Sequence, residues 1–334
     1  MEAARALRTV AFHLERAGEP TYRVAAFRRA ADVVAGLSDD ELAERVRRGT
    51  LTDLKGIGKR IAEVVADAVA GREPEYLRRL LARAEPEVSG GAELLATLKG
   101  DCHSHSDWSD GGSPIREMAE AAGELGHEWL ALTDHSPRLT VARGLSAERL
   151  REQLDVVAEL NAELAPFRIL TGIEVDILDD GTLDQEPALL NRLDVVVASA
   201  HSKLRMPKPA MTRRLLAAVS NPRVNVLGHC TGRLVVGKGR PESEFDADAV
   251  FDACREYDVA VEINSRPDRL DPPRRLLRRA LDAGCRFAID SDAHAPGQLA
   301  WQRYGCARAE ECGVPADRVV NTWRADDVVA WAKA

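Results

Sequence analysis

The residues of this chain that could do chemistry are histidines and carboxylates at the ends of short apolar runs. Imidazole and carboxylate are the groups that divalent transition metals bind in proteins. Side chains two positions apart in an extended segment point the same way, so His103 and His105 can face one site, as can Asp292 and His294. The pattern predicts a hydrolytic centre that binds several metal ions. The ligand candidates are His103, His105, Asp110, His135, Glu174, His201, His229, Asp292 and His294.

The elements that must position these residues alternate between strands and helices. Apolar, β-rich runs predict strands at 98–103, 129–133, 168–172, 194–198, 224–228, 259–263 and 286–290. Helices are expected between them at 114–125, 147–164, 212–219, 247–257 and 274–283. Such repeats are typical of an α/β fold in which a parallel sheet closes into a barrel and the chemistry lies at the carboxyl ends of the strands. The ligand candidates fall at those ends.

The amino-terminal part of the chain has a different texture. Residues 3–82 carry apolar residues at helical spacing and are expected to be entirely helical. Within them, residues 54–62 contain two glycines that allow a tight turn, and the N–H groups at the start of the next helix can hold a phosphate. An ordinary glycine turn between helices is the alternative. The DNA-binding candidates are Lys55, Gly56, Gly58, Lys59 and Arg60, whose basic members would attract a nucleic-acid backbone.

Length and composition favour two domains in an ordinary globular protein. A chain of 334 residues is long for one compact domain. The formal net charge is −8, with a slightly basic amino-terminal part and an acidic remainder. We expect a helical DNA-binding domain at 1–83, a linker at 84–96 and a metal-binding domain at 97–334.

The cysteines and the hydropathy favour a cytoplasmic protein. The six cysteines form no C-x-x-C pair, and reduced thiols in the cytosol are the simpler interpretation. No secretory signal is visible, and no apolar run of about 18 residues predicts a membrane span. We therefore expect no membrane partner.

Several motifs of the predicted barrel carry a family resemblance. They are His103-Ser104-His105, Thr133-Asp134-His135, Gly172-Ile173-Glu174-Val175-Asp176, Gly228-His229 and Ser291-Asp292-Ala293-His294. Through them, residues 97–334 resemble the PHP (polymerase and histidinol phosphatase) family, and especially the C-terminal PHP domain of bacterial family-X DNA polymerases. The resemblance implies a distorted (β/α)7 barrel and a metal-dependent phosphoric ester hydrolase.

The resemblance also implies three divalent metal ions, with zinc, manganese and iron all compatible with the mixed nitrogen and oxygen ligands. One ion would be held by His103, His105, Glu174 and Asp292, a second by Glu174, His201 and His229, and a third by Asp110, His135 and His294. A bridged metal pair activates water near neutral pH and clamps the attacking and leaving oxygens of a phosphoryl displacement.

Four residues are expected to be catalytic. Glu174 would bridge two ions, and Asp110 would belong to the third. A phosphate ester substrate also needs cationic partners, which Arg143 and Arg233 are expected to supply from loops after the strands, because arginine suits bidentate contact with phosphate.

Residues 3–82 resemble the small N-terminal domain of family-X polymerases, through the stretch 18–31 and the hairpin at 54–62. The lyase version of that domain uses a lysine as its nucleophile, and Val64 stands at that place here, so DNA binding is expected rather than lyase activity. The short stretch between Ala82 and Leu98 leaves no room for a polymerase palm, so we expect no polymerase activity.

Together these features predict a DNA-repair enzyme that acts on DNA 3′ ends. It would be a 3′-5′ exonuclease, a 3′-phosphatase or phosphodiesterase, or an enzyme that processes abasic sites. A small-molecule phosphomonoesterase of the histidinol-phosphatase type is the main alternative, since the barrel allows it. A binding protein with purely structural metals is the third.

Overall fold

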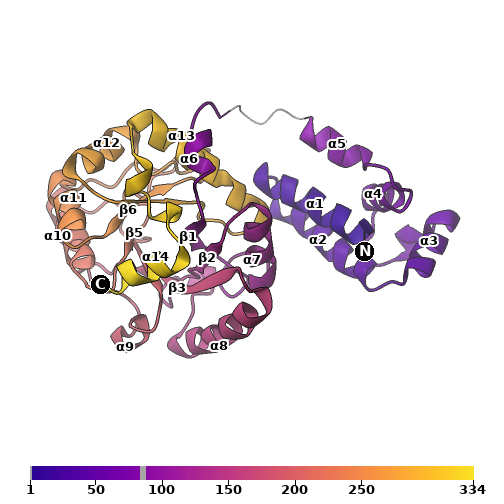
Figure 1. The fold of residues 1–334 in the computed structure, drawn as a ribbon, viewed down its shortest axis with the longest axis horizontal. Helices are drawn as coiled ribbons and strands as arrows, with labels where there is room; N and C mark the ends of the chain where they lie inside the picture. The colour runs from indigo at the N-terminus through magenta and orange to yellow at the C-terminus, as the bar shows by residue number, and fades with distance from the viewer. Residues whose placement is uncertain (1, 83–87) are drawn as a thin grey trace. The chain divides into compact units, whose positions relative to one another are not determined.

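The computed structural model describes residues 2–82 and 88–334 (Figure 1). The chain divides into two compact units, Met1–Glu87 and Val88–Ala334, and each has its own buried core. Residues 84–87 of the predicted linker lie outside the described residues, so the linker stays a prediction there.

The described remainder of that linker, residues 88–96, belongs to the second unit. It contains the short helix α6 (Ala92–Leu95), which packs against α13 (Gln302–Cys312). Gly91 makes this approach possible, because a Cβ at this position would lie 2.3 Å from the backbone nitrogen of Ala307.

The first unit is entirely helical, as the sequence predicts. Its elements are α1 (Glu2–Arg16), α2 (Thr21–Ala35), α3 (Asp39–Arg48), the 3-10 helix η1 (Leu51–Asp53), α4 (Lys59–Val69) and α5 (Glu75–Leu81). Leu7 and Leu14 of α1 pack in one core with Phe27 of α2 and Val65 of α4. This core fixes α3 and α4 on either side of the glycine-containing turn.

The second unit is built on a parallel sheet of seven strands in chain order. The strands are β1 (Gly100–Ser104), β2 (Trp129–Leu132), β3 (Arg168–Asp176), β4 (Val195–Ser199), β5 (Val226–Leu227), β6 (Ala260–Asn264) and β7 (Phe287–Asp290). A bridge between Ser104 and Ala293 joins the two ends of this order. The sheet is therefore a nearly closed barrel, and the predicted (β/α)7 fold is confirmed.

Helices cover the outside of the barrel. Those expected from the sequence are α7 (Ile115–Glu124), α8 (Ala147–Leu164), α10 (Lys208–Val219), α11 (Ala247–Glu256) and α12 (Arg274–Ala283). Four further helices were not predicted from the sequence: α6, α13, α9 (Pro187–Leu190) and α14 (Ala325–Ala332). Helix α10 begins earlier than expected, because Pro207 and Pro209 suit the first positions of a helix.

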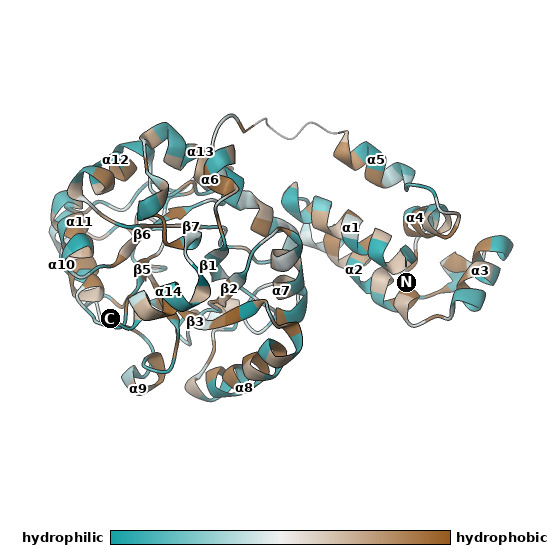
Figure 2. Cartoon of the chain, viewed as in Figure 1, coloured by the Kyte–Doolittle hydropathy of each residue, from teal (hydrophilic) through white to brown (hydrophobic). Residues whose placement is uncertain are grey.

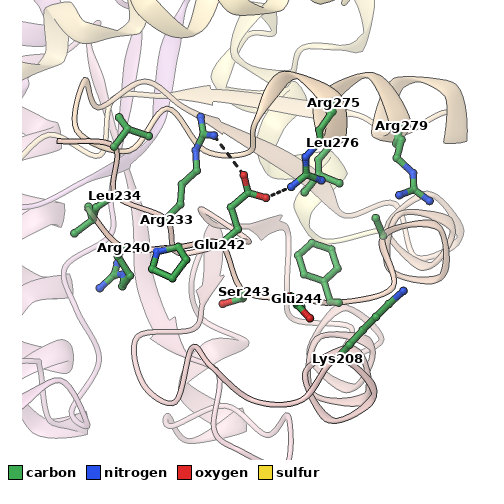
Figure 3. A pocket seen from close by; sticks show the side chains of 14 residues that line it. Lys208, Arg233, Leu234, Arg240, Glu242, Ser243, Glu244, Arg275, Leu276 and Arg279 are labelled. Atoms are coloured by element: carbon green, nitrogen blue, oxygen red, sulfur yellow. Dashed lines mark hydrogen bonds and ion pairs between the residues drawn. The ribbon is translucent and has the colours of Figure 1, made fainter. Parts of the chain in front are cut away.

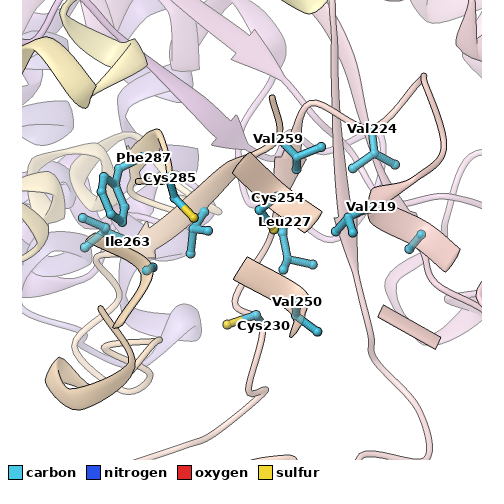
Figure 4. Close-up of a cluster of buried hydrophobic side chains, with 14 of the residues drawn as sticks. Val219, Val224, Leu227, Cys230, Val250, Cys254, Val259, Ile263, Cys285 and Phe287 are labelled. Carbon is cyan, nitrogen blue, oxygen red and sulfur yellow. The ribbon is translucent and has the colours of Figure 1, made fainter. Parts of the chain in front are cut away.

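Apolar side chains pack between the strands and these helices. In Figure 4, Val250 and Cys254 of α11 lie near Leu227 of β5 and Val259, in the largest buried cluster of the protein. All six cysteines, each of them in the described part of the chain, are free and buried. They act as small apolar side chains in this packing.

A separate cluster fills the barrel interior. Its largest member, Trp129, lies against Gly100, where a Cβ would come within 2.2 Å of the indole ring. The indole Nε1 donates to the carbonyl of Trp323 at 2.9 Å, and Val328 of α14 packs on the same cluster. Because apolar residues fill this interior, the polar residues gather at the carboxyl ends of the strands.

The helices around the barrel are amphipathic. Figure 2 shows hydrophilic and hydrophobic residues interspersed along α8 and α12, as expected for helices with one face on the sheet. Among the described residues, no helix combines the length and apolarity needed to cross a membrane.

Candidate metal centre

The structure gathers the ligand candidates at the carboxyl ends of the barrel strands. His103 lies in β1 and Glu174 in β3, while the loops that follow the strands carry His105, Asp110, His135, His201, His229, Asp292 and His294. The six imidazoles form a ring of neighbours with centroids 4.2–6.0 Å apart. The strand-end positions therefore converge on one centre.

Glu174 lies in the middle of this centre and is only 1% exposed. Its Oε2 is 2.8 Å from His135 Nδ1 and 3.3 Å from His103 Nε2. Its Oε1 is 2.9 Å from His229 Nε2 and 3.3 Å from His201 Nε2. Oε2 also lies 3.6 Å from His105 Nε2, so the two carboxylate oxygens together face five imidazoles, as expected for a ligand shared between ions.

Two aspartates complete the centre, Asp110 from the loop after β1 and Asp292 from the loop after β7. Asp292 Oδ1 is 3.4 Å from His105 Nε2, and Asp110 Oδ1 is 3.5 Å from His135 Nε2 and 3.4 Å from His294 Nε2. The backbone of Asp292 has a φ of 51°, a conformation that few non-glycine residues adopt and that clusters at functional sites. Asp110 is the most accessible of these carboxylates, with 37% of its side chain exposed.

The hydrogen bonding of the centre fits metal ions. Buried imidazole nitrogens are normally satisfied, because an unpaired buried polar atom is costly. Within the described residues, the atoms His103 Nε2, both ring nitrogens of His105 and of His201, His135 Nδ1, His229 Nδ1 and Glu174 Oε2 have no hydrogen-bond partner. In a neutral imidazole one of the two ring nitrogens carries a lone pair, and a divalent cation binds through that nitrogen.

The ligand candidates form three close groups. In each group every residue offers one ligand atom, and these atoms lie within 4.8 Å of one another. They are His105, Asp110, His135 and His294; His103, His105 and Glu174; and His135, Glu174 and His201. The groups overlap the three predicted ligand sets, with His105 and His135 each reaching two groups. The assignment of individual ligands to individual ions stays a prediction.

Glu262 supports the centre from β6, and the sequence analysis assigned it no role. Its Oε1 is 2.6 Å from His103 Nδ1, and its Oε2 accepts from the backbone N–H of His229 and from Asn264 Nδ2. A carboxylate on the other nitrogen of a ligand imidazole fixes the tautomer and orientation of the ring. The available signal was a lone acidic residue inside an otherwise apolar strand.

Asp134 holds a loop beside the centre, whereas Asp176 also contacts a ligand imidazole, with its Oδ1 3.4 Å from His201 Nδ1. Asp134 accepts hydrogen bonds from Ser106, Ser109 and Gln153, which fixes the loop after β1. Asp176 accepts from the backbone N–H of His201 at 3.1 Å. Both carboxylates therefore place segments that carry ligand candidates.

The carboxylates at the centre are held in their charged form. Burial alone would raise the pKa of Glu174, but the surrounding imidazoles, His103 foremost, lower it well below its usual range. Burial opposes ionisation of Asp292 in the same way, and Arg266 and His103 lower its pKa. Both groups are therefore available as anionic ligands.

The two arginines expected to bind phosphate lie differently. Arg143 is exposed, and its guanidinium is 3.5 Å from the carbonyl oxygen of Asp107, in the loop that carries Asp110. The guanidinium of Arg233 donates to the carbonyls of Arg269 and Leu270 and so fixes the loop after β6. Its expected contact with phosphate stays a prediction.

That loop places two other guanidiniums at the centre. Arg266 NH1 is 3.2 Å from His294 Nδ1, and Arg269 Nε is 3.4 Å from Asp292 Oδ2. Two buried nitrogens of Arg269 have no hydrogen-bond partner among the described atoms. Only the three-dimensional path of the loop shows that these arginines, rather than Arg233, face the ligands.

The hairpin of the first unit presents its candidates to solvent. Gly56 has a φ of 88°, and Gly58 precedes the first turn of α4. Ile57 between them is buried in the helical core. Consequently Lys55, Lys59 and Arg60 stay exposed around free N–H groups at the start of a helix. Val64 is buried in the helical core, and the absence of lyase activity stays a prediction.

Comparisons with known proteins agree with this architecture. Residues 101–266 match the PHP domain family, and residues 1–73 match a helix-hairpin-helix domain family. The chain thus carries a PHP domain and an N-terminal helix-hairpin-helix domain. The fold and its centre define a metal-dependent phosphoesterase.

Individual relatives carry related names. The chain is 41% identical over 239 residues to the DNA polymerase/3′-5′ exonuclease PolX of Bacillus subtilis strain 168, covering 72% of this chain and 42% of that protein. It therefore spans less than half of that relative. It is 29% identical over 237 residues to a probable phosphatase of Thermoanaerobacter sp. strain X514, covering 66% and 89%. A histidinol phosphate phosphatase structure from Lactococcus lactis, with zinc, L-histidinol and phosphate, is 19% identical with a TM-score of 0.49, covering 65% and 94%.

Proposed function

We propose that this protein hydrolyses phosphoester bonds at DNA 3′ ends in DNA repair, by removing 3′ nucleotides, 3′ phosphates or abasic remnants. One observation carries the proposal: a single chain joins a buried ligand centre to a helical unit with an exposed, basic hairpin. The 3′-5′ exonuclease in the name of the Bacillus subtilis relative supports it.

The ligand sets proposed for three divalent ions follow the sequence prediction, with Glu174 shared between two of them. Zinc, manganese and iron suit these nitrogen and oxygen donors. When bound, such ions supply Lewis-acid activation of water and neutralise charge on the phosphoryl oxygens. The unpartnered imidazole nitrogens are the observation that supports this assignment.

The chain's own residues would bind and orient the ester. Arg266 and Arg269 face the centre and can donate to non-bridging phosphate oxygens. Arg143, on the loop side near Asp110, can contact the same group as it enters. In the helical unit, the N–H groups after Gly58 and the ammonium groups of Lys55 and Lys59 would hold backbone phosphates of the DNA.

The proposal is tested with 5′-labelled single-stranded and duplex DNA that carries a 3′-hydroxyl, a 3′-phosphate or an abasic site. The purified protein is incubated with Mn²⁺ or Zn²⁺, with His103→Ala as the inactive control. We expect metal-dependent shortening or dephosphorylation that the control lacks. Unchanged DNA under every condition, together with turnover of small phosphoesters, would refute the proposal.

A second candidate function is a small-molecule phosphomonoesterase. The relative named as a probable phosphatase favours it, because the match covers 89% of that protein without needing the helical unit. Hydrolysis of histidinol phosphate at micromolar KM, without competition from DNA, would favour this alternative.

A cytoplasmic location belongs to the main proposal and is consistent with the free, buried cysteines.

A further inference from the structure

A second basic feature lies on the barrel unit beside the loops after β5 and β6. It is a pocket of about 610 Å³, a volume typical of ligand sites (Figure 3). Its carboxylates are Glu242 and Glu244. Its cations, which define what we name the basic pocket, are Lys208, Arg233, Arg240, Arg275 and Arg279. Asp248, outside the lining, accepts from Arg279 Nε at 3.0 Å, so five cations face three carboxylates and the pocket is suited to an anion.

Its cations come from separate elements and are held in place. Arg275 and Arg279 are one turn apart on α12, so they project from the same face of the helix. Glu242 joins Arg275 to Arg233, as the dashed lines of Figure 3 show. Lys208, at the start of α10, makes no ion pair within residues 2–82 and 88–334.

The basic pocket is connected to the metal centre through the loop after β6. Arg269 meets Asp292 of the centre on one side, while its carbonyl oxygen accepts from Arg233 Nε at 3.0 Å on the other. The loop after β5 is held to the same segment, since Val235 N–H donates to the carbonyl of Asp268 at 2.7 Å. The loop after β6 thus contacts the metal centre through the side chain of Arg269 and the pocket through its backbone carbonyls.

Arg240 adds a further guanidinium to the pocket from the loop after β5. Burial lowers the pKa of its guanidinium and the neighbouring Arg269 lowers it further, while Asp271 and Asp268 act in the opposite direction. Cations held this close gain most from an anion that runs between them. On the same hairpin, Val235 and Val236 are 49% and 55% exposed and offer an apolar surface beside the cations.

We propose that the basic pocket binds the sugar-phosphate backbone of a single nucleic-acid strand, on the 5′ side of the linkage that lies at the metal centre. A small phosphate would need cations that converge on one point, whereas these are spread over two helices and a hairpin. An extended polyanion with apolar bases matches the combination of spread cations and exposed valines. This inference rests on the proposed function and adds the path of the strand.

The test compares two double variants of the full-length protein that remove the same charge from the same helix. Arg275→Gln/Arg279→Gln empties one side of the pocket. Arg274→Gln/Arg278→Gln, on the neighbouring face of α12 and outside the pocket lining, is the matched control. Steady-state hydrolysis is measured with a single-stranded dodecanucleotide, a dinucleotide and bis(p-nitrophenyl) phosphate over a range of salt concentrations.

We expect the pocket variant to raise KM for the dodecanucleotide about tenfold. The salt dependence of this KM should fall by the amount that corresponds to about two phosphate contacts. Its kcat, and its turnover of the two short substrates, should match the control, because those substrates do not reach the pocket. If the pocket variant also lost activity on short substrates, Lys208→Gln would decide: a threefold rise in KM confined to the dodecanucleotide supports the proposal, and no rise overturns it.

The two possible failures are distinguishable. If the wild-type protein degrades the dodecanucleotide but the two double variants behave alike, the pocket proposal is wrong and the proposed function stands. If the wild-type protein hydrolyses bis(p-nitrophenyl) phosphate and leaves every DNA intact, the proposed function fails and the strand path fails with it.

Discussion

The two units of this protein place their charged side chains in opposite ways. In the barrel, charged side chains are buried and converge, so that Glu174 lies within 3.6 Å of five imidazoles while it is almost fully covered. In the helical unit, Ile57 and Ile61 of the hairpin are buried, and its glycines and basic side chains face solvent. Buried groups are needed to hold metals and reacting atoms, whereas exposed groups suffice to hold a solvated polyanion.

This contrast has an energetic meaning. A buried polar atom without a partner is destabilising by about 1–3 kcal/mol, so the barrel is built to gain from ligands that bind there. An exposed lysine remains hydrated, so it has no comparable desolvation cost and contributes mainly salt-dependent affinity. Substitutions in the two units should therefore fail in different assays.

The largest effect is expected for Glu174→Gln. Loss of the shared carboxylate charge should lower kcat by roughly a thousandfold on DNA and on bis(p-nitrophenyl) phosphate alike, the scale seen when a central catalytic group is removed. Metal content measured by mass spectrometry should fall with it. Glu128→Gln, an exposed change on the same unit, is the control. If the variant kept its activity within threefold of wild type, the contrast between the buried centre and the exposed hairpin would be contradicted.

Metal removal should lower the melting temperature of the barrel unit and leave that of the helical unit unchanged. All five tryptophans lie in the second unit, so tryptophan fluorescence reports only on the barrel, whereas far-ultraviolet circular dichroism reports on both units. Metal at about 100 times its Kd should stabilise the barrel by about 2.7 kcal/mol. The helical unit should melt at the same temperature with and without chelator. An equal shift of both transitions would contradict the account.

Glu262→Gln tests the support behind the ligands. The amide can still accept from His103 but carries no charge, so metal affinity should fall by about 10–100-fold. Activity should return when the metal concentration is raised, which a loss of folding would not permit. An activation curve that coincides with that of wild type would show that Glu262 does not tune the centre.

The smallest effect is expected in the hairpin. Lys55→Gln/Lys59→Gln should weaken DNA binding about tenfold and reduce the salt dependence by about two contacts, with bis(p-nitrophenyl) phosphate hydrolysis unchanged. Arg5→Gln/Arg8→Gln, which removes two exposed charges from α1, is the matched control. Equal affinities for the two variants, measured by fluorescence anisotropy, would place DNA recognition elsewhere.

The sequence was sufficient for features that repeat or follow a strand. Alternating apolar runs predicted all seven strands, and strand-end positions predicted which histidines and carboxylates would meet. The strand expected at 224–228 is short, with only Val226 and Leu227 in regular pairing. Local patterns thus located the centre, because a parallel barrel collects strand ends by construction.

Features that depend on the path of a loop could not be predicted. Arg233 and Arg269 have the same side chain and lie in similar loops, yet one donates to backbone carbonyls and the other meets Asp292. The role of Glu262 depends on pairing between β5 and β6, which places it beneath His229. Such choices are set by tertiary contacts rather than by residue type.

The central claim is that the buried histidines and carboxylates bind metal ions. Anomalous diffraction from crystals grown with Mn²⁺ tests this claim most directly. We predict anomalous peaks among the carboxyl ends of the strands, with Glu174 contacting more than one peak and the unpartnered imidazole nitrogens directed at them. A well-ordered centre without anomalous peaks, at saturating Mn²⁺ or Zn²⁺, would contradict the assignment of these residues as metal ligands.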